Sequence, residues 1–286
     1  MAKLGLACIL RPMSADEHTT NPPIVLVIAG SDCSASAGLQ ADLKTVSALG
    51  SFCMTAVTAV TAQNSQGVDL IEPVPPAAIR AQLQSVFADY RVSAIKIGML
   101  GSRATVETVA AEIASHSDVP LVLDPVMTAT TGSSLIDADA QAALTEQLFP
   151  RATLLTPNAP EAAQLTGLPV VDSSHMEPAA RQLMKTGCHA VLLKGGHIEG
   201  KTDTVTDLLV DPTSSQRFSY PYQSNPNTRG TGCTLSSAIA CYLAQGRSLH
   251  QAVSAAGTFV SHAITHGIQL GAQAGPLGHF SFEAKP

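Results

Sequence analysis

The feature that most constrains the fold of this chain is the repeated alternation of short aliphatic runs with segments whose apolar residues recur at helical spacing. Residues 24–30 (IVLVIAG) precede Leu39 and Leu43, which are spaced as on one face of a helix. Further strand-length aliphatic runs follow at residues 56–63, 94–100, 120–126, 152–158 and 190–196. Strands that alternate with helices form βαβ units with right-handed crossovers. The sequence therefore predicts a doubly wound α/β fold with a mostly parallel central sheet.

Length and composition indicate one large domain. The chain has 286 residues, of which 45% are hydrophobic and only 4% aromatic, and it contains no Trp. A core of Ala, Val, Leu and Ile suits a parallel sheet that helices cover on both faces. We expect a single domain over residues 23–286, preceded by a loose extension, residues 1–22, that carries no chemistry. Residues 211–216 (DPTSSQ) are interpreted as a hairpin or a short excursion within the domain, and not as a domain boundary.

Charge, cysteine spacing and hydropathy argue against several classes of protein. The formal net charge of −6 leaves no basic stripe for a nucleic acid. The six cysteines show no paired C-x-x-C spacing, which argues against a zinc cluster or a disulfide framework and favours a reducing compartment. No apolar run reaches the roughly 18–20 residues of a membrane span. We therefore expect a cytoplasmic protein that acts on a small molecule, and neither a nucleic-acid nor a membrane partner.

The residues that end the predicted strands are mostly small or polar. In an open parallel sheet, ligands bind beyond the carboxyl ends of the strands, so these residues are candidates for a binding site. They include Gly30, Asp32, Gln63, Gly98, Asp124, Asn158 and Lys194. Ordinary loop composition would account for any one of these positions, but less readily for the whole set.

The strongest candidate for phosphate binding is the segment 227–246 (NTRGTGCTLSSAIACYLAQG). Gly230 and Gly232 precede apolar residues that are spaced as on a helix. A Gly-x-Gly turn that opens a helix exposes backbone N–H groups and the positive end of the helix dipole, which together form an anion site. Cys233 lies in this turn, where a lowered pKa would let its thiol take a proton from a substrate hydroxyl. The alternative is a buried, inert Cys beside a tight turn.

A second stretch, residues 194–203 (KGGHIEGKTD), matches the pattern of a phosphate-binding P-loop through Gly195 and the Gly-Lys-Thr of residues 200–202. A true P-loop leads straight into a helix. Residues 202–211 (TDTVTDLLVD) are rich in Thr, Val and Asp and predict an extended strand instead. We therefore interpret the match as the tip of a loop between two strands.

The segments named above resemble, in order, the signature segments of the hydroxymethylpyrimidine/phosphomethylpyrimidine kinases of thiamine biosynthesis, members of the ribokinase-like superfamily. The resemblance spans about residues 24–246 and returns at GPLGHF (275–280). It is carried by AGSD and AGLQADLKTVSALG (within 29–50), TAVTAQNSQGV (58–68), IKIGML (95–100), VLDPVM (122–127), TPNAPEA (156–162), LLKGGH (192–197) and NTRGTGCTLSSAIA (227–240). It implies a ribokinase-like three-layer α/β/α sandwich.

The resemblance also implies an activity and an acceptor pocket. The family uses ATP and Mg²⁺ to phosphorylate the hydroxymethyl group of 4-amino-5-hydroxymethyl-2-methylpyrimidine and then the resulting monophosphate. Asp42, Gln63 and Met99 match substrate-binding positions, and Gly30 and Val126 match positions that line the pocket. The amide of Gln63 offers donors and an acceptor together, which suits the edge of an aminopyrimidine. Judged without the resemblance, Asp42 would be an exposed residue of a helix turn and Met99 would fill the core.

A second implied set of residues serves the phosphates. Asn158 and Glu161 resemble the Asn-x-x-Glu element that organises Mg²⁺ and its waters, and Asp124 is an additional metal candidate. Mg²⁺ is usually held by few carboxylates and several waters, so such a sparse set suffices. Judged without the resemblance, Glu161 would be a capping or surface residue. The remaining implied roles are ATP binding by Lys194, Gly195, Asn158 and Thr231, and phosphoryl transfer by Gly230, Gly232 and Cys233, with Cys233 as the base.

The chain departs from the family pattern in two loops. Ala35 and Ser36 replace a usual Gly pair, which would alter the shape of the pocket lid because glycine tolerates positive φ. Ser133 follows Gly132 where the family tends to carry Asp.

Two other functions stay open at this point. One is a pyridoxal or pyridoxine kinase of the same fold, which Gln63 and Met99 modestly disfavour. The other is a non-catalytic sensor of a vitamin precursor, against which the complete phosphoryl-transfer set argues. By analogy with the superfamily we expect a homodimer.

Overall fold

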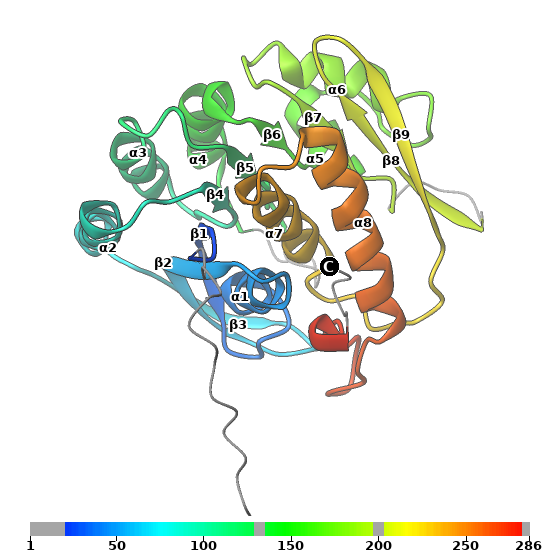
Figure 1. The fold of residues 1–286 in the computed structure, drawn as a ribbon, viewed down its shortest axis with the longest axis horizontal. Coiled ribbons are helices and arrows are strands. Elements are labelled where there is room, and N and C mark those ends of the chain that lie inside the picture. Colours follow the sequence, from blue (N-terminus) through cyan, green and yellow to red (C-terminus); the bar gives the residue numbers. More distant parts are fainter. Residues whose placement is uncertain (1–20, 129–134, 197–202, 282–286) are drawn as a thin grey trace, which may run out of the picture.

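The computed structural model of this protein describes residues 21–128, 135–196 and 203–281. Within these ranges nine strands form one sheet in the order β3-β2-β1-β4-β5-β6-β7-β8-β9 (Figure 1). The strands are β1 (Ile24–Asp32), β2 (Phe52–Gln63), β3 (Val68–Pro73), β4 (Ala94–Ile97), β5 (Leu121–Leu123), β6 (Leu154–Leu155), β7 (Val191–Leu193), β8 (Thr204–Val210) and β9 (Ser215–Pro221). Each predicted aliphatic run contributes one of these strands.

The strand directions confirm a mostly parallel sheet. The central strands β2, β1, β4, β5, β6 and β7 run parallel. At one edge β3 pairs antiparallel with β2, after a turn in which Asn64 Oδ1 accepts two backbone N–H groups. At the other edge β8 pairs antiparallel with both β7 and β9. The predicted hairpin at 211–216 is confirmed, because Asp211 Oδ1 accepts two backbone N–H groups at 2.7 Å in the turn between β8 and β9.

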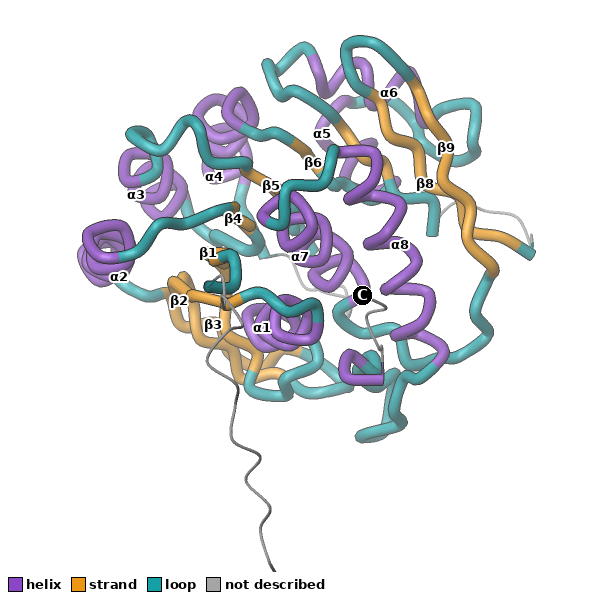
Figure 2. The backbone as a smooth tube through the Cα atoms, viewed as in Figure 1, coloured by secondary structure: helices purple, strands orange, loops and turns teal. Residues whose placement is uncertain are grey.

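Helices cover both faces of the sheet. They are α1 (Gly38–Ala48), α2 (Pro76–Asp89), α3 (Arg103–Glu112), α4 (Ala138–Ala143), α5 (Ala159–Thr166), α6 (Met176–Met184), α7 (Thr231–Ala244) and α8 (Leu249–Thr265). Shorter helical turns lie at Leu144–Leu148 (η1), Phe149–Arg151 (η2) and His279–Ser281 (η3). Helices α1, α7 and α8 form one layer and α2 to α6 form the other (Figures 1 and 2). The result is the α/β/α sandwich that the resemblance implied.

Strand β1 shows why its sequence is aliphatic throughout. Val25 and Val27 pack with the layer of α1, α7 and α8, whereas Leu26 and Ile28 pack with the opposite layer. Successive side chains of a strand point to opposite faces, and all four of these are fully buried. Burial of one such side chain contributes about 1.5–3 kcal/mol. A central strand between two helical layers therefore needs apolar residues at every position.

The direction of winding changes at β1. The chain passes from β1 to β2 on one side of the sheet, and β4 later joins β1 on the other side. The carboxyl ends of β1 and β4 therefore flank a topological switch point, where open α/β sheets bind ligands. The register between β1 and β2 shifts between Ala29 and Ser31, so Gly30 lies at an irregularity of the strand. The β1–α1 loop begins at this place.

Some sequence-based expectations concern residues outside the described ranges. The Gly132-Ser133 departure, most of the extension 1–22 and the Gly-Lys-Thr of residues 200–202 lie there. Strand β8 begins at Thr204, which confirms the predicted extended structure after the P-loop match.

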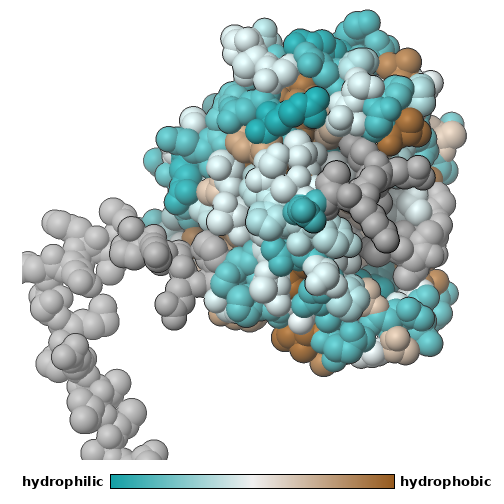
Figure 3. All heavy atoms as spheres, turned by 90° about the vertical axis from the view of Figure 1, so that its right-hand side faces the viewer, coloured by the Kyte–Doolittle hydropathy of each residue, from teal (hydrophilic) through white to brown (hydrophobic). Residues whose placement is uncertain are grey.

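The outer surface beside β9 and α8 is mostly hydrophilic, with apolar residues in separate places (Figure 3). Single exposed apolar side chains are normal on a folded protein. Of the helices that the structure describes, none is both long enough and apolar enough to cross a bilayer.

Candidate active site

A cavity of about 910 Å³ opens at the carboxyl ends of the parallel strands. This volume lies near the upper end of the range of small-molecule sites, about 300–1,000 Å³, so the cavity can accommodate a large ligand or two smaller ones. Most of the residues that the sequence singled out line it. They are Gly30, Gln63, Met99, Asp124, Val126, Asn158, Glu161, Lys194, Gly230, Thr231, Gly232 and Cys233.

The N-terminus of α7 forms one wall of the cavity. Gly230 precedes the helix with φ +80°, and a Cβ at this position would collide with the carbonyl oxygen of Ser36. A Cβ on Gly232 would lie 3.3 Å from Lys194 Nζ and 3.5 Å from Asp124 Oδ2. The N–H groups of Gly232 and Cys233 find no acceptor among the described residues. Such amides, together with the helix dipole, supply the donors that the predicted anion site requires.

The Cys233 thiol lies partly buried at the cavity wall. Burial raises the pKa of Cys233 to about 11; the nearby Lys96 charge opposes this shift, and the charges of Asp42 and Asp124 add to it. The expectation of a lowered pKa was therefore wrong, because desolvation outweighs the helix dipole here. At neutral pH the thiol of the unliganded protein is protonated.

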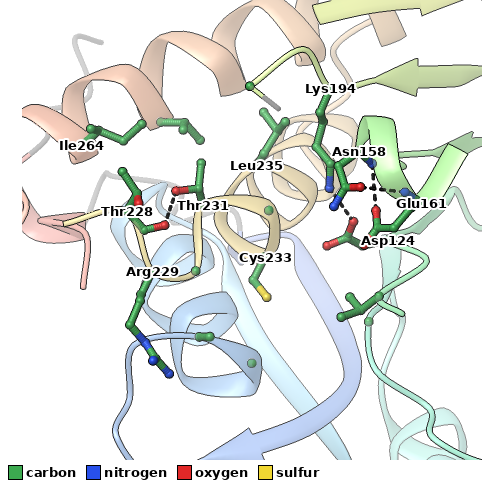
Figure 4. Close-up of a pocket in the computed structure, with 18 of the residues that line it drawn as sticks. Asp124, Asn158, Glu161, Lys194, Thr228, Arg229, Thr231, Cys233, Leu235 and Ile264 are labelled. Carbon is green, nitrogen blue, oxygen red and sulfur yellow. Dashed lines mark hydrogen bonds and ion pairs between the residues drawn. The ribbon is translucent and has the colours of Figure 1, made fainter. Parts of the chain in front are cut away.

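Lys194, Asp124 and Glu161 form a charged group on the other side of the α7 N-terminus (Figure 4). Lys194 Nζ lies 2.9 Å from Asp124 Oδ1, which also accepts a hydrogen bond from Thr156 Oγ1 at 3.0 Å. Burial raises the pKa of Glu161 to about 7, a shift that the Lys194 charge opposes and the Asp124 charge increases. One cation thus faces two carboxylates.

Asn158 and Glu161 form a capping box at the start of α5. Asn158 Oδ1 accepts the N–H of Glu161 at 2.8 Å, and Glu161 Oε2 accepts the N–H of Asn158 at 2.8 Å. Capping was the alternative interpretation of Glu161, and it proves compatible with a place in the site because both residues also line the cavity. The cap fixes the position of the carboxylate.

This charged group offers few protein ligands to a divalent cation. The part of the chain that the structure describes has no cluster of three His, Cys, Asp or Glu side chains that could hold a metal ion. The two carboxylates of Asp124 and Glu161, which share one lysine, nevertheless fit Mg²⁺, since this ion keeps several waters and takes oxygen ligands from phosphates.

The opposite side of the cavity, formed by β1, β2 and β4, holds the predicted acceptor residues. A Cβ on Gly30 would lie 3.2 Å from Met99 Sδ, so Gly30 lets the thioether lie close to the strand. The Cys33 Sγ contacts the backbone N and O of Gln63 at 3.3 and 3.2 Å. The Gln63 side chain makes no hydrogen bond to another described residue, and its amide is left to a ligand.

The β1–α1 loop accommodates the chain's departure from the Gly pair. Ala35 adopts φ +56°, the left-handed conformation that a glycine would take without strain. The loop is fixed by Asp32, whose carboxylate accepts the backbone N–H groups of Ser34, Ser36 and Ala37 at 2.8, 3.2 and 2.9 Å. A left-handed turn is therefore retained here despite the missing glycine.

Asp42 does not line the cavity, in contrast to the implied substrate-binding role, nor is it exposed. Both its carboxylate oxygens lie 2.9 Å from Lys96 Nζ, and Ser237 Oγ donates to Oδ1 at 2.7 Å. Burial favours the neutral amine of Lys96, but the Asp42 carboxylate outweighs this effect and raises the lysine pKa. It is Lys96, which the sequence analysis missed, that reaches the cavity wall.

Gly195 also lies outside the cavity lining. Its N–H donates to Asp207 Oδ1 at 2.9 Å, and a Cβ would collide with the backbone oxygen of Thr206. Its glycine identity is thus explained by close packing of the chain against β8.

Arg229 is a second cavity residue that the sequence analysis missed. It is 3% exposed, and its Nε and Nη1 atoms have no hydrogen-bond partner among the described residues. Its backbone N–H donates to the carbonyl of Gly275 at 3.2 Å. In Figure 4 the side chains of Arg229 and Cys233 project in the same direction from the start of α7. The only sequence signal was a charge next to the Gly-x-Gly turn.

Sequence comparisons find relatives over most of the chain. A family model described as phosphomethylpyrimidine kinase matches residues 32–278. A hydroxymethylpyrimidine/phosphomethylpyrimidine kinase of Streptomyces coelicolor is 46% identical over 267 residues, which cover 93% of this chain and 98% of that protein. The thiamine biosynthesis bifunctional protein ThiED of Geobacter sulfurreducens is 47% identical over 255 residues, 89% of this chain. This chain spans only 52% of the length of that bifunctional protein.

Solved structures confirm the predicted fold. The ADP complex of Bacillus subtilis pyridoxal kinase has a TM-score of 0.83 and 34% sequence identity, covering 91% of this chain and 98% of that one. A phosphomethylpyrimidine kinase from Clostridium difficile has a TM-score of 0.75 and 36% identity, covering 85% and 99%.

Proposed function

Because this chain belongs to the phosphomethylpyrimidine kinase family, we propose that it is an ATP-dependent kinase of thiamine biosynthesis. It phosphorylates 4-amino-5-hydroxymethyl-2-methylpyrimidine and then its monophosphate. The observation that carries this proposal is the start of α7, where the free amides of Gly232 and Cys233 adjoin the Lys194–Asp124 pair in one cavity. This arrangement suits stabilisation of a phosphoryl group in transfer, which a mere sensor of a neutral precursor does not need.

The ATP phosphates bind on the side of Lys194. The α7 amide N–H groups donate hydrogen bonds to the oxygens of the transferred phosphoryl group, and Lys194 adds positive charge to the phosphates, helped by Thr231 and Asn158 on the cavity wall. Mg²⁺, when bound, neutralises phosphate charge and orients the transferred group. Asp124 and Glu161 would hold it, largely through water.

The acceptor binds on the side of β1, β2 and β4. The Gln63 amide recognises the aminopyrimidine edge, while Gly30, Met99 and Val126 enclose the ring. The hydroxymethyl group then points to Cys233. Burial favours the protonated thiol in the free protein, and the Lys96 charge opposes this effect, so Lys96 supports the thiolate form in which Cys233 acts as the base.

Phosphorylation of pyridoxal is the second candidate function. The TM-score to the pyridoxal kinase of Bacillus subtilis, 0.83, exceeds that to the Clostridium difficile phosphomethylpyrimidine kinase, 0.75. The two acceptors share an aromatic ring with a hydroxymethyl group, so one pocket can serve both.

The test is ATP turnover with hydroxymethylpyrimidine, its monophosphate and pyridoxal in parallel, in the wild type and in Cys233→Ala. We expect turnover of both pyrimidines and a loss of about 10²–10⁴-fold in Cys233→Ala. Cys53→Ala is the matched control, because Cys53 lies on β2 and does not line the cavity. Turnover of pyridoxal alone would favour the second candidate, and turnover of none of the three would contradict both kinase functions.

The proposal also covers the compartment and the oligomeric state of the enzyme. The described cysteines, Cys33, Cys53, Cys188, Cys233 and Cys241, are all free thiols, which supports a reducing cytoplasm. We also propose a homodimer, as the superfamily analogy implies. Sedimentation at micromolar concentration would test the dimer directly.

A further inference from the structure

We propose that Arg229 binds the phosphate of the monophosphate acceptor, and so equips this site for the second phosphoryl transfer. This inference rests on the proposed function and names the residue that distinguishes its two acceptors. Arg229 lines the cavity at 3% exposure, yet Nε and Nη1 have no partner within the described part of the chain. A buried charge without a partner is costly, so its retention points to a ligand that supplies the opposite charge.

The two lysines of the cavity do not share this lack of a partner. Lys96 and Lys194 each lie 2.9 Å from an aspartate carboxylate. Arg229 forms no ion pair with any described residue. Its position is nevertheless fixed, because its backbone N–H donates to Gly275 at 3.2 Å. The backbone at Arg229 is therefore fixed, while its buried guanidinium forms no charge pair with a described residue.

The location of Arg229 favours the acceptor phosphate over the phosphates of ATP. The next residue, Gly230, lies against the backbone of Ser36 in the β1–α1 loop. This loop belongs to the acceptor side of the cavity. In Figure 4 the side chains of Arg229 and Cys233 extend in the same direction from the start of α7, whereas Lys194 and Glu161 lie across the helix N-terminus. The guanidinium thus lies on the side where the acceptor meets the base.

The chemistry of the second transfer requires an additional cation. The alcohol acceptor is neutral, but the monophosphate carries a dianionic group that must approach the triphosphate. Repulsion between two phosphates at contact distance is large in a site of low dielectric constant. An arginine fork pairs with phosphate oxygens in a bidentate manner and stays protonated at any pH of interest. The remaining lysines are already neutralised by aspartates.

The experiment compares Arg229→Gln, Arg229→Lys and the wild type for both acceptors. We expect Arg229→Gln to lower the ratio of kcat/KM for the monophosphate to kcat/KM for the alcohol on the order of 10- to 100-fold. Calorimetric titration of the monophosphate without nucleotide should show a Kd raised by a similar factor. Arg229→Lys should recover part of the loss, since lysine keeps the charge but not the fork. Arg247→Gln is the control, because Arg247 is exposed and stacks on Tyr242 outside the cavity.

The outcomes separate this inference from its premise. Equal losses for both acceptors, or an unchanged monophosphate Kd in Arg229→Gln, would overturn the role of Arg229. A wild type that turns over neither acceptor, yet binds the monophosphate in an Arg229-dependent manner, would retain the phosphate site and reject the kinase. A folding role would show as a lowered thermal midpoint of unliganded Arg229→Gln; we expect a midpoint at or above the wild-type value, because the variant removes an unpartnered buried charge.

Discussion

Two lysine–aspartate ion pairs at the cavity have equal N–O distances but differ in burial and in their further partners. Lys96 and Asp42, on the acceptor side, are both 0% exposed, and Ser237 completes the hydrogen bonds of the carboxylate. Lys194, on the phosphate side, is 14% exposed, and a second carboxylate, Glu161, competes for its charge. Both N–O distances are 2.9 Å. The first pair is saturated and joins α1, β4 and α7, whereas the second is partly exposed in the cavity and shares its lysine with a second carboxylate.

The largest expected effect breaks the saturated pair. Lys96→Met leaves Asp42 with only the Ser237 hydroxyl, and the removal of one partner from a buried pair should cost about 3–5 kcal/mol of unfolding free energy. Urea denaturation measures this loss. The double variant Lys96→Met/Asp42→Leu should recover most of it, since no charge is left unpaired. A single-variant loss below about 1 kcal/mol would show that water or rearrangement satisfies Asp42.

The second prediction concerns the partly exposed pair of Lys194 and Asp124. Asp124→Asn should lower kcat/KM by about 10²–10³-fold, or about 2.7–4 kcal/mol of transition-state stabilisation, because it removes one of the two carboxylates that would hold Mg²⁺. Unfolding free energy should fall by only about 1–2 kcal/mol, since Glu161 still faces Lys194. Steady-state kinetics and urea denaturation measure the two quantities. Asp69→Asn, on exposed β3, is the control. If Asp124→Asn destabilised the protein as much as Lys96→Met, the contrast between the pairs would be wrong.

A third prediction uses pH to sharpen the comparison. Burial raises the pKa of Glu161 to about 7 from 4.5, so the folded protein binds more protons than the unfolded chain between these values. Stability should therefore decrease as pH rises from about 4.5 to 7, by on the order of 1–3 kcal/mol. Urea denaturation at pH 5 and pH 8 without metal ions measures the contribution of this group. Glu161→Gln should remove it, and an unchanged slope in this variant would assign the dependence to other groups.

The smallest effect concerns the loop of the acceptor side. Ala35→Gly relieves a positive φ at the cost of chain entropy, so we expect a gain of about 1 kcal/mol or less. Ala81→Gly, at an exposed position within α2, is the matched control and should lose about 1 kcal/mol. Thermal denaturation of both variants compares them. A similar loss in both would mean that Ala35 is not strained.

The fold could be predicted from the sequence because the aliphatic runs and the helical spacing are local patterns. Strand β3 was not predicted, since VDLIEP contains two acids and a proline and becomes a strand only by pairing with β2. Its formation depends on a tertiary contact. The hairpin of β8 and β9 was predicted because its turn chemistry lies within Asp211 to Ser214.

The candidate site divides in the same way. Residues at strand ends and in the Gly-x-Gly turn were found, because topology alone brings them together. The raised pKa of Cys233 and the buried place of Asp42 were missed, since both depend on charges contributed by other elements. Lys96 did leave a local signal: a lysine between two isoleucines of a buried strand needs an anion inside the protein.

The segment around Gly275, just before η3, is synthesised after the other parts of the site and contacts the residues that lead into α7. Gly275 donates its N–H to Asn227 Oδ1 at 2.7 Å and accepts the N–H of Arg229, so this late segment fixes the residues that lead into α7. A ribosome delivers β1 about 240 residues before Gly275. The nascent chain can assemble its sheet while translation continues. We expect it to acquire a complete phosphate pocket only after the segment around Gly275 has emerged, so that ATP turnover cannot begin before this segment is in place.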